Sequence, residues 1–114
     1  MNKKENNELY DLLVDTLMMV NPDRKNPNPN EFEEHLVELE GDYYTFFHID
    51  NLKKLQNENK LNLAQVNKIQ KIRHLIENIE PALWNVQAFM FDKSWIEVSV
   101  LALDVLKSLG INKR

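Results

Sequence analysis

The sequence predicts an all-α protein, a single-domain helical bundle of five to six helices over residues 1–114. Two observations lead to this prediction. Apolar residues recur at three- and four-residue spacing through most of the chain, which is the period of an amphipathic helix. The chain also has only two glycines and four prolines, so few positions interrupt that period. A length of 114 residues fits one domain.

The first predicted helix covers residues 5–20. Its apolar stripe faces a row of acidic residues and consists of Leu9, Leu13, Thr16, Leu17 and Val20. Pro22 is expected to end it. A Pro/Asn-rich connector, NPDRKNPNPN, then occupies residues 21–30. We expect this connector to be extended, because proline fixes φ and restricts the residue before it.

The second predicted helix begins at Asn30, which forms a capping box with Glu33, and ends at Gly41. Its core stripe is Phe32, Leu36 and Leu39. Asp42 could cap a third helix at about residues 43–56. The start of that segment, YYTFF, is typical of a strand. A helix is nevertheless favoured, because an isolated strand does not persist without a pairing partner.

The fourth predicted helix has the clearest start. Asn62 and Gln65 form a capping box, and Leu61 and Val66 flank it as a hydrophobic staple. An apolar stripe continues to residue 79. Pro81 suits the first turn of a fifth helix at residues 81–91.

The last predicted helix covers residues 95–109, after a capping box of Ser94 and Glu97. It is apolar on most sides, which predicts a central position in the bundle. Gly110 is expected to end it, with Ile111 closing back on Leu106.

Composition excludes several classes of function. The chain has no cysteine, so disulfides, thiolate metal sites and cysteine nucleophiles are impossible. The N-terminal apolar run is broken by acidic residues, unlike a signal peptide, and no segment reaches the roughly 20 apolar residues that span a bilayer. We expect a cytoplasmic protein that does not enter the membrane. The sequence does not indicate an oligomeric state.

The charge is concentrated in one segment. Residues 31–50 contain seven acidic residues and no lysine or arginine, while the rest of the chain has 14 basic against 11 acidic residues. Lys68 and Lys71 lie one helical turn apart and could contact a phosphate backbone. A neighbouring acidic surface would repel it, so no nucleic acid is expected as a partner.

Catalytic and metal sites find little support. His35 with Glu38, and His74 with Glu77, are each one turn apart. Di-iron bundles use the opposite order, Glu-x-x-His, with further inward glutamates. No nucleophile elbow or glycine-rich phosphate loop is present. We therefore expect no catalytic residue, no metal and no cofactor, and a protein that is not an enzyme.

The acidic segment is the predicted partner-binding site. One alternative is an ordinary solvated helix face beside an aromatic core. Two features favour a partner instead: like charges repel one another when no cation intervenes, and tyrosine is frequent at interface hot spots. The predicted site residues are Glu31, Glu33, Glu34, Glu38, Glu40, Asp42, Tyr43, Tyr44 and Asp50.

The segment EFEEHLVELEGDYY, residues 31–44, resembles the colicin-type nuclease immunity proteins. In that family a glutamate-rich helix is followed by an Asp and a Tyr-Tyr pair, which correspond here to Asp42, Tyr43 and Tyr44. Immunity proteins of contact-dependent and polymorphic toxin systems are similar in size, acidity and helicity. The resemblance implies a cytoplasmic inhibitor of a cognate basic toxin, a DNase or RNase. The two tyrosines would then be anchors, and the carboxylates would pair with cations around the toxin's cleft or a nearby exosite.

A second function remains open on the sequence. A small helical adaptor or regulatory protein, such as one derived from a phage, would also act by protein–protein binding through an acidic surface with aromatic residues.

Overall fold

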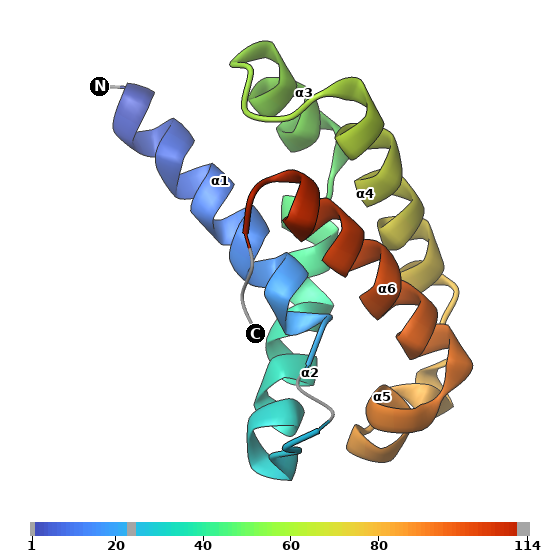
Figure 1. Cartoon of the computed structure of the whole chain (residues 1–114). Coiled ribbons are helices and arrows are strands. Elements are labelled where there is room, and N and C mark those ends of the chain that lie inside the picture. The colour runs from blue at the N-terminus through green and yellow to red at the C-terminus, as the bar shows by residue number, and fades with distance from the viewer. Residues whose placement is uncertain (1, 23–24, 112–114) are drawn as a thin grey trace.

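The computed structural model describes residues 2–22 and 25–111, with side chains from residue 8 onwards. Over these residues the chain is all-α, as predicted, and forms six α-helices and a short 3-10 turn without any strand (Figure 1). The elements are α1 (Asn2–Met19), α2 (Pro29–Phe46), α3 (Ile49–Asn57), α4 (Leu63–Glu77), η1 (Pro81–Leu83), α5 (Val86–Phe91) and α6 (Lys93–Ser108).

Helix α6 packs against three other helices but is not covered on all sides as its apolar sequence would predict, because Ile96 and Val100 are exposed. It packs against α4, α1 and α5, while α2 packs against α1 and α5 (Figure 1). Trp95, Val98, Ala102 and Val105 are among the α6 residues that point into the core. Helix α2 therefore forms one outer wall of the bundle, and the short α5 closes the end between α2 and α6.

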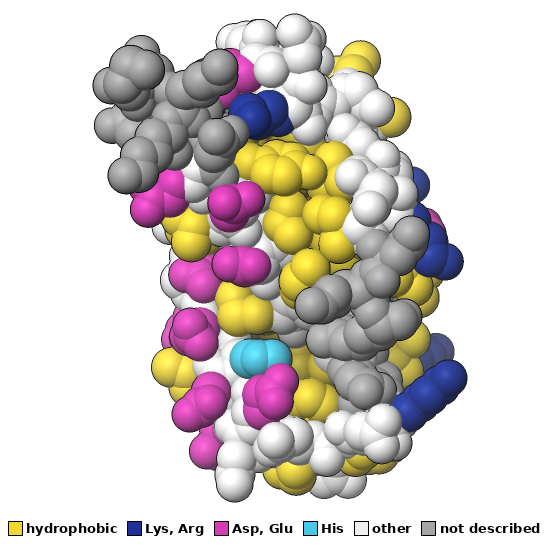
Figure 2. Space-filling view, turned by 60° about the vertical axis from the view of Figure 1, so that its left-hand side comes forward, with side chains coloured by type: hydrophobic (Ala, Val, Ile, Leu, Met, Phe, Trp, Pro, Cys, Tyr) yellow, Lys and Arg dark blue, Asp and Glu magenta, His cyan; other side chains and the backbone are white. Residues whose placement is uncertain are grey.

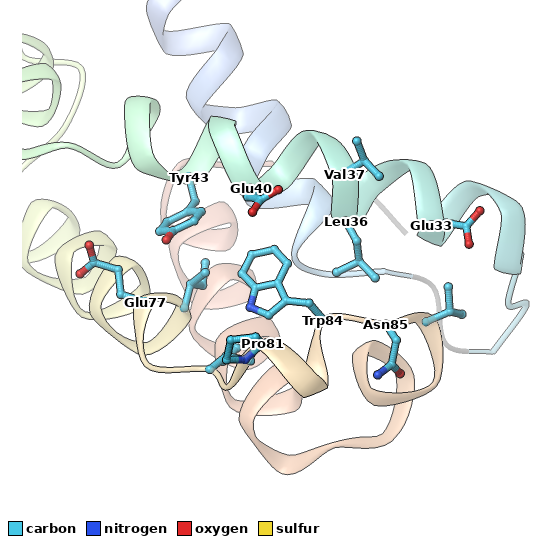
Figure 3. A pocket seen from close by; sticks show the side chains of 12 residues that line it. Glu33, Leu36, Val37, Glu40, Tyr43, Glu77, Pro81, Trp84 and Asn85 are labelled. Carbon is cyan, nitrogen blue, oxygen red and sulfur yellow. The ribbon is translucent and has the colours of Figure 1, made fainter.

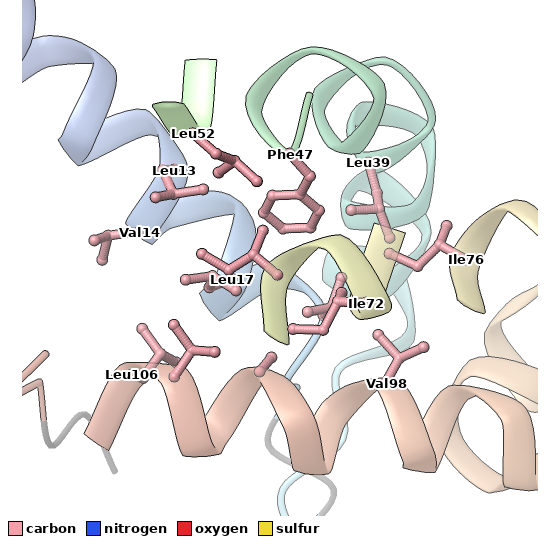
Figure 4. Close-up of a cluster of buried hydrophobic side chains, with 14 of the residues drawn as sticks. Leu13, Val14, Leu17, Leu39, Phe47, Leu52, Ile72, Ile76, Val98 and Leu106 are labelled. Carbon is pink, nitrogen blue, oxygen red and sulfur yellow. The ribbon is translucent and has the colours of Figure 1, made fainter. Parts of the chain in front are cut away.

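The core confirms the predicted stripes of the helices. Leu13 and Leu17 of α1 meet Leu39 of α2 and Ile72 of α4 in one cluster of buried side chains (Figure 4). Phe47, which follows α2, is fully buried among them. Burial of such side chains is the main favourable contribution to the folded state.

The predicted start of α2 is wrong by two residues. Asn28, not Asn30, is the N-cap, and its side chain accepts a hydrogen bond from the Glu31 amide at 3.2 Å. Pro29 then occupies the first helical position, where its fixed φ suits the helix and its missing N–H is not needed. The connector predicted at residues 21–30 therefore ends before Pro29.

The predicted end of α2 at Gly41 is also wrong, because α2 continues to Phe46. Gly41 does not have the positive φ of a C-terminal glycine, whereas Gly110 has φ of 80°. The helix ends at Phe46 with Phe47 as its C-cap, and Asp42 lies within it instead of capping a third helix. A side chain added at Gly41 would meet no atom within 4 Å.

Replacing Gly41 with alanine is therefore expected to stabilise the protein. The change removes backbone freedom from the unfolded chain and creates no clash, and it should raise the free energy of unfolding by about 0.5–1 kcal/mol. Gly110→Ala is the matched opposite, because its left-handed φ strains any residue with a Cβ. Urea unfolding of both variants measures the difference. A loss of stability in Gly41→Ala would contradict the continuous α2.

The break between α2 and α3 is held by two polar side chains. Nδ1 of His48, the N-cap of α3, accepts a hydrogen bond from the Asp50 amide at 3.1 Å. The Asn51 side chain donates to the Thr45 carbonyl at 2.7 Å, and the His48 amide donates to the same carbonyl at 3.3 Å. The predicted helix at residues 43–56 is thus two helices divided at Phe47 and His48.

The other predicted ends are largely confirmed. Asn62 and Gln65 exchange both bonds of a capping box, each at 2.8 Å. Gly110 and Ile111 donate to the carbonyls of Lys107 and Leu106, which is the pair of bonds expected at a glycine-terminated helix. The predicted N-cap of α6 is wrong. Asp92, not Ser94, is the N-cap, and its side chain accepts a hydrogen bond from the Ser94 amide at 2.9 Å.

The segment after Pro81 is not one continuous helix. Residues Pro81–Leu83 form η1, and α5 starts only at Val86 with Asn85 as its N-cap. The Asn85 side chain accepts from the Ala88 amide at 2.9 Å and donates to the Ala82 carbonyl at 2.8 Å. This one residue therefore fixes η1 against α5.

Candidate functional site

The carboxylates of α2 form two separate rows on the helix. The outer row consists of Glu31, Glu34, Glu38 and Asp42, which recur at spacings of three and four residues. The inner row consists of Glu33 and Glu40 with Val37 between them. All five glutamates are exposed and Asp42 is half-buried. The structure thus divides the predicted acidic site into two neighbouring surfaces.

Few cations compensate these charges. Among the residues whose side chains are described, the only ion pair of an α2 carboxylate is Glu31 with His35, at 3.6 Å. Partial burial and the nearby Glu38 carboxylate raise the pKa of Asp42 above its ordinary value. A raised pKa means that the folded protein disfavours the charged form of this group. Burial thus contributes most to the shift of the Asp42 pKa, and repulsion from Glu38 adds to it.

The inner row borders a groove of about 580 Å³, which is within the range of ligand-binding clefts (Figure 3). It lies between α2, the end of α4 and the turn from η1 to α5. Buried or half-buried apolar side chains line much of it, and three glutamates stand among the lining residues without any basic residue. The lining residues are Glu33, Leu36, Val37, Glu40, Tyr43, Ile76, Glu77, Ile79, Pro81, Trp84, Asn85 and Val86.

Trp84 forms the aromatic wall of the groove opposite α2. Its ring lies 6.2 Å from the ring of Tyr43 and packs edge-on against Trp95 at 5.1 Å. The Trp95 indole N–H donates to the Leu83 carbonyl at 2.8 Å, which fixes the backbone beside Trp84. Asn85 fixes the other side of that wall.

The two predicted anchors, Tyr43 and Tyr44, point in different directions. Tyr43 is half-buried in the groove, and burial together with the nearby Glu77 carboxylate raises the pKa of its hydroxyl. Tyr44 is 59% exposed, and the Arg73 guanidinium of α4 lies 4.9 Å from its ring centre. That distance permits a cation–π interaction. Arg73 also pairs with Glu77 at 3.4 Å.

Asp50 is separate from the two rows. It lies in the first turn of α3, beyond the break, with its side chain 86% exposed and 3.7 Å from the His48 imidazole. A carboxylate at a helix N-terminus is favourable for the helix itself. The fold thus gives Asp50 a local structural role.

A scan against protein-family models and searches of curated proteins and of solved structures return no match to this chain. Over residues 2–22 and 25–111, no helix is long and apolar enough to cross a membrane. Among the described side chains, those of residues 8–22 and 25–111, no three from His, Cys, Asp or Glu are grouped so that they could hold a metal ion.

Three contributors to the site were missed by sequence reasoning. Trp84 and Glu77 enter the groove from segments distant from α2 in sequence, so no local pattern places them there. The third contributor is α1, which packs against α2 and exposes Glu8, Asp11 and Asp15. The sequence shows this acidic row, but it does not show that the helix carrying it packs against α2. Figure 2 shows acidic side chains along one edge of a face of the molecule, with most of the visible Lys and Arg at the other edge.

Proposed function

We propose that the protein is an immunity protein that binds and inhibits a basic bacterial toxin, a nuclease, through the acidic surface of α2. The observation that carries the proposal is the charge of that helix. It has six carboxylates between Glu31 and Asp42, and within the described side chains only His35 pairs with any of them. A nuclease cleft is lined with cations that bind phosphates. A surface of this kind complements such a cleft.

The arrangement of the surface supports the proposal further. Carboxylates at the edge of an interface accelerate association, while desolvated apolar and aromatic groups at its centre provide most of the affinity. Here the exposed outer row lies beside a groove that contains Tyr43 and Trp84. Helix α2 therefore provides attraction over a distance and also one wall of the groove in which close contact can occur.

The proposal predicts that a toxin gene lies beside the gene of this protein, and the test uses the catalytic domain of that toxin. An equimolar amount of the protein is expected to abolish nuclease activity, and the association rate should fall steeply as salt is raised. Reversing the outer row with Glu34→Lys/Glu38→Lys should slow association by about tenfold or more. Glu97→Lys, on an exposed position of α6, is the control.

Two outcomes would contradict the proposal at different levels. Nuclease activity that persists in excess protein would exclude the inhibitory function. Unchanged association of Glu34→Lys/Glu38→Lys would exclude the outer row as part of the contact surface.

A helical adaptor is the second candidate, and the groove is the observation that favours it. Apolar grooves between helices accept short segments of partner proteins. An adaptor would bind its partner without abolishing an activity, so the same nuclease assay separates the two functions.

A further inference from the structure

We infer that the groove beside α2 binds a partner segment that carries one large apolar side chain between two cationic side chains. This inference rests on the proposed function in taking the partner to be a basic protein. It adds the feature of that protein that is recognised. Three properties of the groove support it: its apolar floor, its uncompensated charge and the spacing of its carboxylates.

The apolar floor fits a large side chain. Leu36, Ile76 and Ile79 are buried beneath the groove, and the rings of Tyr43 and Trp84 form two of its sides (Figure 3). Burying an aromatic or branched aliphatic side chain in such a site is favourable, because it removes apolar surface from water. An aromatic ring would also pack against Trp84, which offers its remaining surface to the groove.

The charge of the groove selects cations beside that side chain. Glu77 is already paired with Arg73 at 3.4 Å. Glu33 and Glu40 have no ion pair with any described side chain, so their charges remain uncompensated at the rim. A carboxylate or phosphate brought to this groove would be repelled, whereas Lys or Arg would be attracted. An acidic peptide or a nucleic acid is therefore disfavoured.

The spacing of the two free carboxylates defines the segment. Glu33 and Glu40 are seven residues apart on one helix, which corresponds to about 10.5 Å along its axis. Val37, which is 71% exposed, lies between them on the same side. A partner helix with cations at positions i and i+7 and an apolar residue at i+3 or i+4 presents all three groups on one face. Such a helix matches the rim of the groove group by group.

A synthetic peptide tests the inference without knowledge of the partner. The probe is a stapled helical peptide with Lys at i and i+7 and Phe at i+3. Binding is followed by NMR through the indole N–H signals of the two tryptophans. Trp84 lines the groove, and Trp95 is buried with its N–H bonded to Leu83. The Trp84 signal is expected to shift saturably, and the Trp95 signal to move less.

Two matched double variants locate the charge contribution. Glu33→Gln/Glu40→Gln removes both free carboxylates at the rim with little change of shape. It should lower the affinity for the peptide by roughly fivefold to tenfold. Glu97→Gln/Asp104→Asn removes the same charge at the same seven-residue spacing from α6, outside both acidic rows and the groove, and should change the affinity by less than about twofold. All four positions are exposed, so both variants are expected to fold.

Several results would overturn the inference. These are no saturable shift of Trp84, equal weakening in the two double variants, or equal binding of a peptide with Glu in place of Lys. Self-association that depends on Glu33 and Glu40 would assign the groove to a second copy of the chain. Toxin inhibition is measured separately on Glu33→Gln/Glu40→Gln. Full inhibition without peptide binding rejects the groove while leaving the proposed function intact, and lack of inhibition by the native chain rejects the function itself.

Discussion

Replacing Trp95 with alanine is expected to lower the free energy of unfolding by about 3–5 kcal/mol. Trp95 is fully buried and packs edge-on against both Trp84 and Phe89, with ring centres 5.1 Å apart in each pair. Its removal leaves a cavity and also an unsatisfied carbonyl at Leu83. Because domains of this size are stable by only about 5–15 kcal/mol, the loss is a large share of the total.

Urea unfolding monitored by circular dichroism measures this effect. The neighbouring variant Ile96→Ala is the control. Because Ile96 is 39% exposed, its replacement should lower the free energy of unfolding much less. Trp95→Phe keeps a ring but not the N–H donor, and is expected to fall between the two. Similar losses for Trp95→Ala and Ile96→Ala would contradict the buried position of Trp95.

Replacing Phe47 with alanine should have an effect of similar size, about 3–5 kcal/mol. Phe47 is 0% exposed at the point where α2 gives way to α3, and it packs within the cluster that joins α1, α2 and α4 (Figure 4). Truncation would both open a cavity and loosen the junction of the two helices.

Phe46→Ala is a sharp comparison for this prediction. The two phenylalanines are adjacent, and sequence reasoning could not rank them, but Phe46 is only half-buried. Truncation of Phe46 should therefore lower the free energy of unfolding distinctly less than truncation of Phe47. The denaturation midpoints of the two variants measure the difference. An equal loss of stability would contradict the burial of Phe47 in the core. A change of slope in either variant would indicate altered compactness instead.

Much of the fold could be predicted because its signals are local. The apolar stripe of α1, the capping box at Asn62 and the glycine-terminated end at Gly110 each depend on residues a few positions apart. The error at Gly41 arises where a local signal competes with burial. A glycine within a helix costs only about 1 kcal/mol. Burial of Phe47, which the longer helix positions, contributes about 1.5–3 kcal/mol.

In the candidate site, too, the local feature could be predicted from the sequence and the feature that depends on tertiary packing could not. The carboxylates of α2 are visible in sequence because they follow one another on a single helix. The groove is not, because Trp84 approaches Tyr43 only when α5 closes against α2 and α6. The different surroundings of Tyr43 and Tyr44 likewise depend on which helices flank α2, and two adjacent residues in a sequence do not contain that information.

The wall of the groove also gives a way to detect a ligand before its chemistry is known. Residues 81–91 are short elements fixed by the bonds of Asn85 and by the bond from Trp95 to Leu83. Local opening of such a unit exposes its amides to exchange with solvent. Any molecule that binds only the closed wall must slow that exchange in proportion to its occupancy. Deuterium uptake over these eleven residues is therefore a label-free signal of occupancy in a mixture of candidate partners.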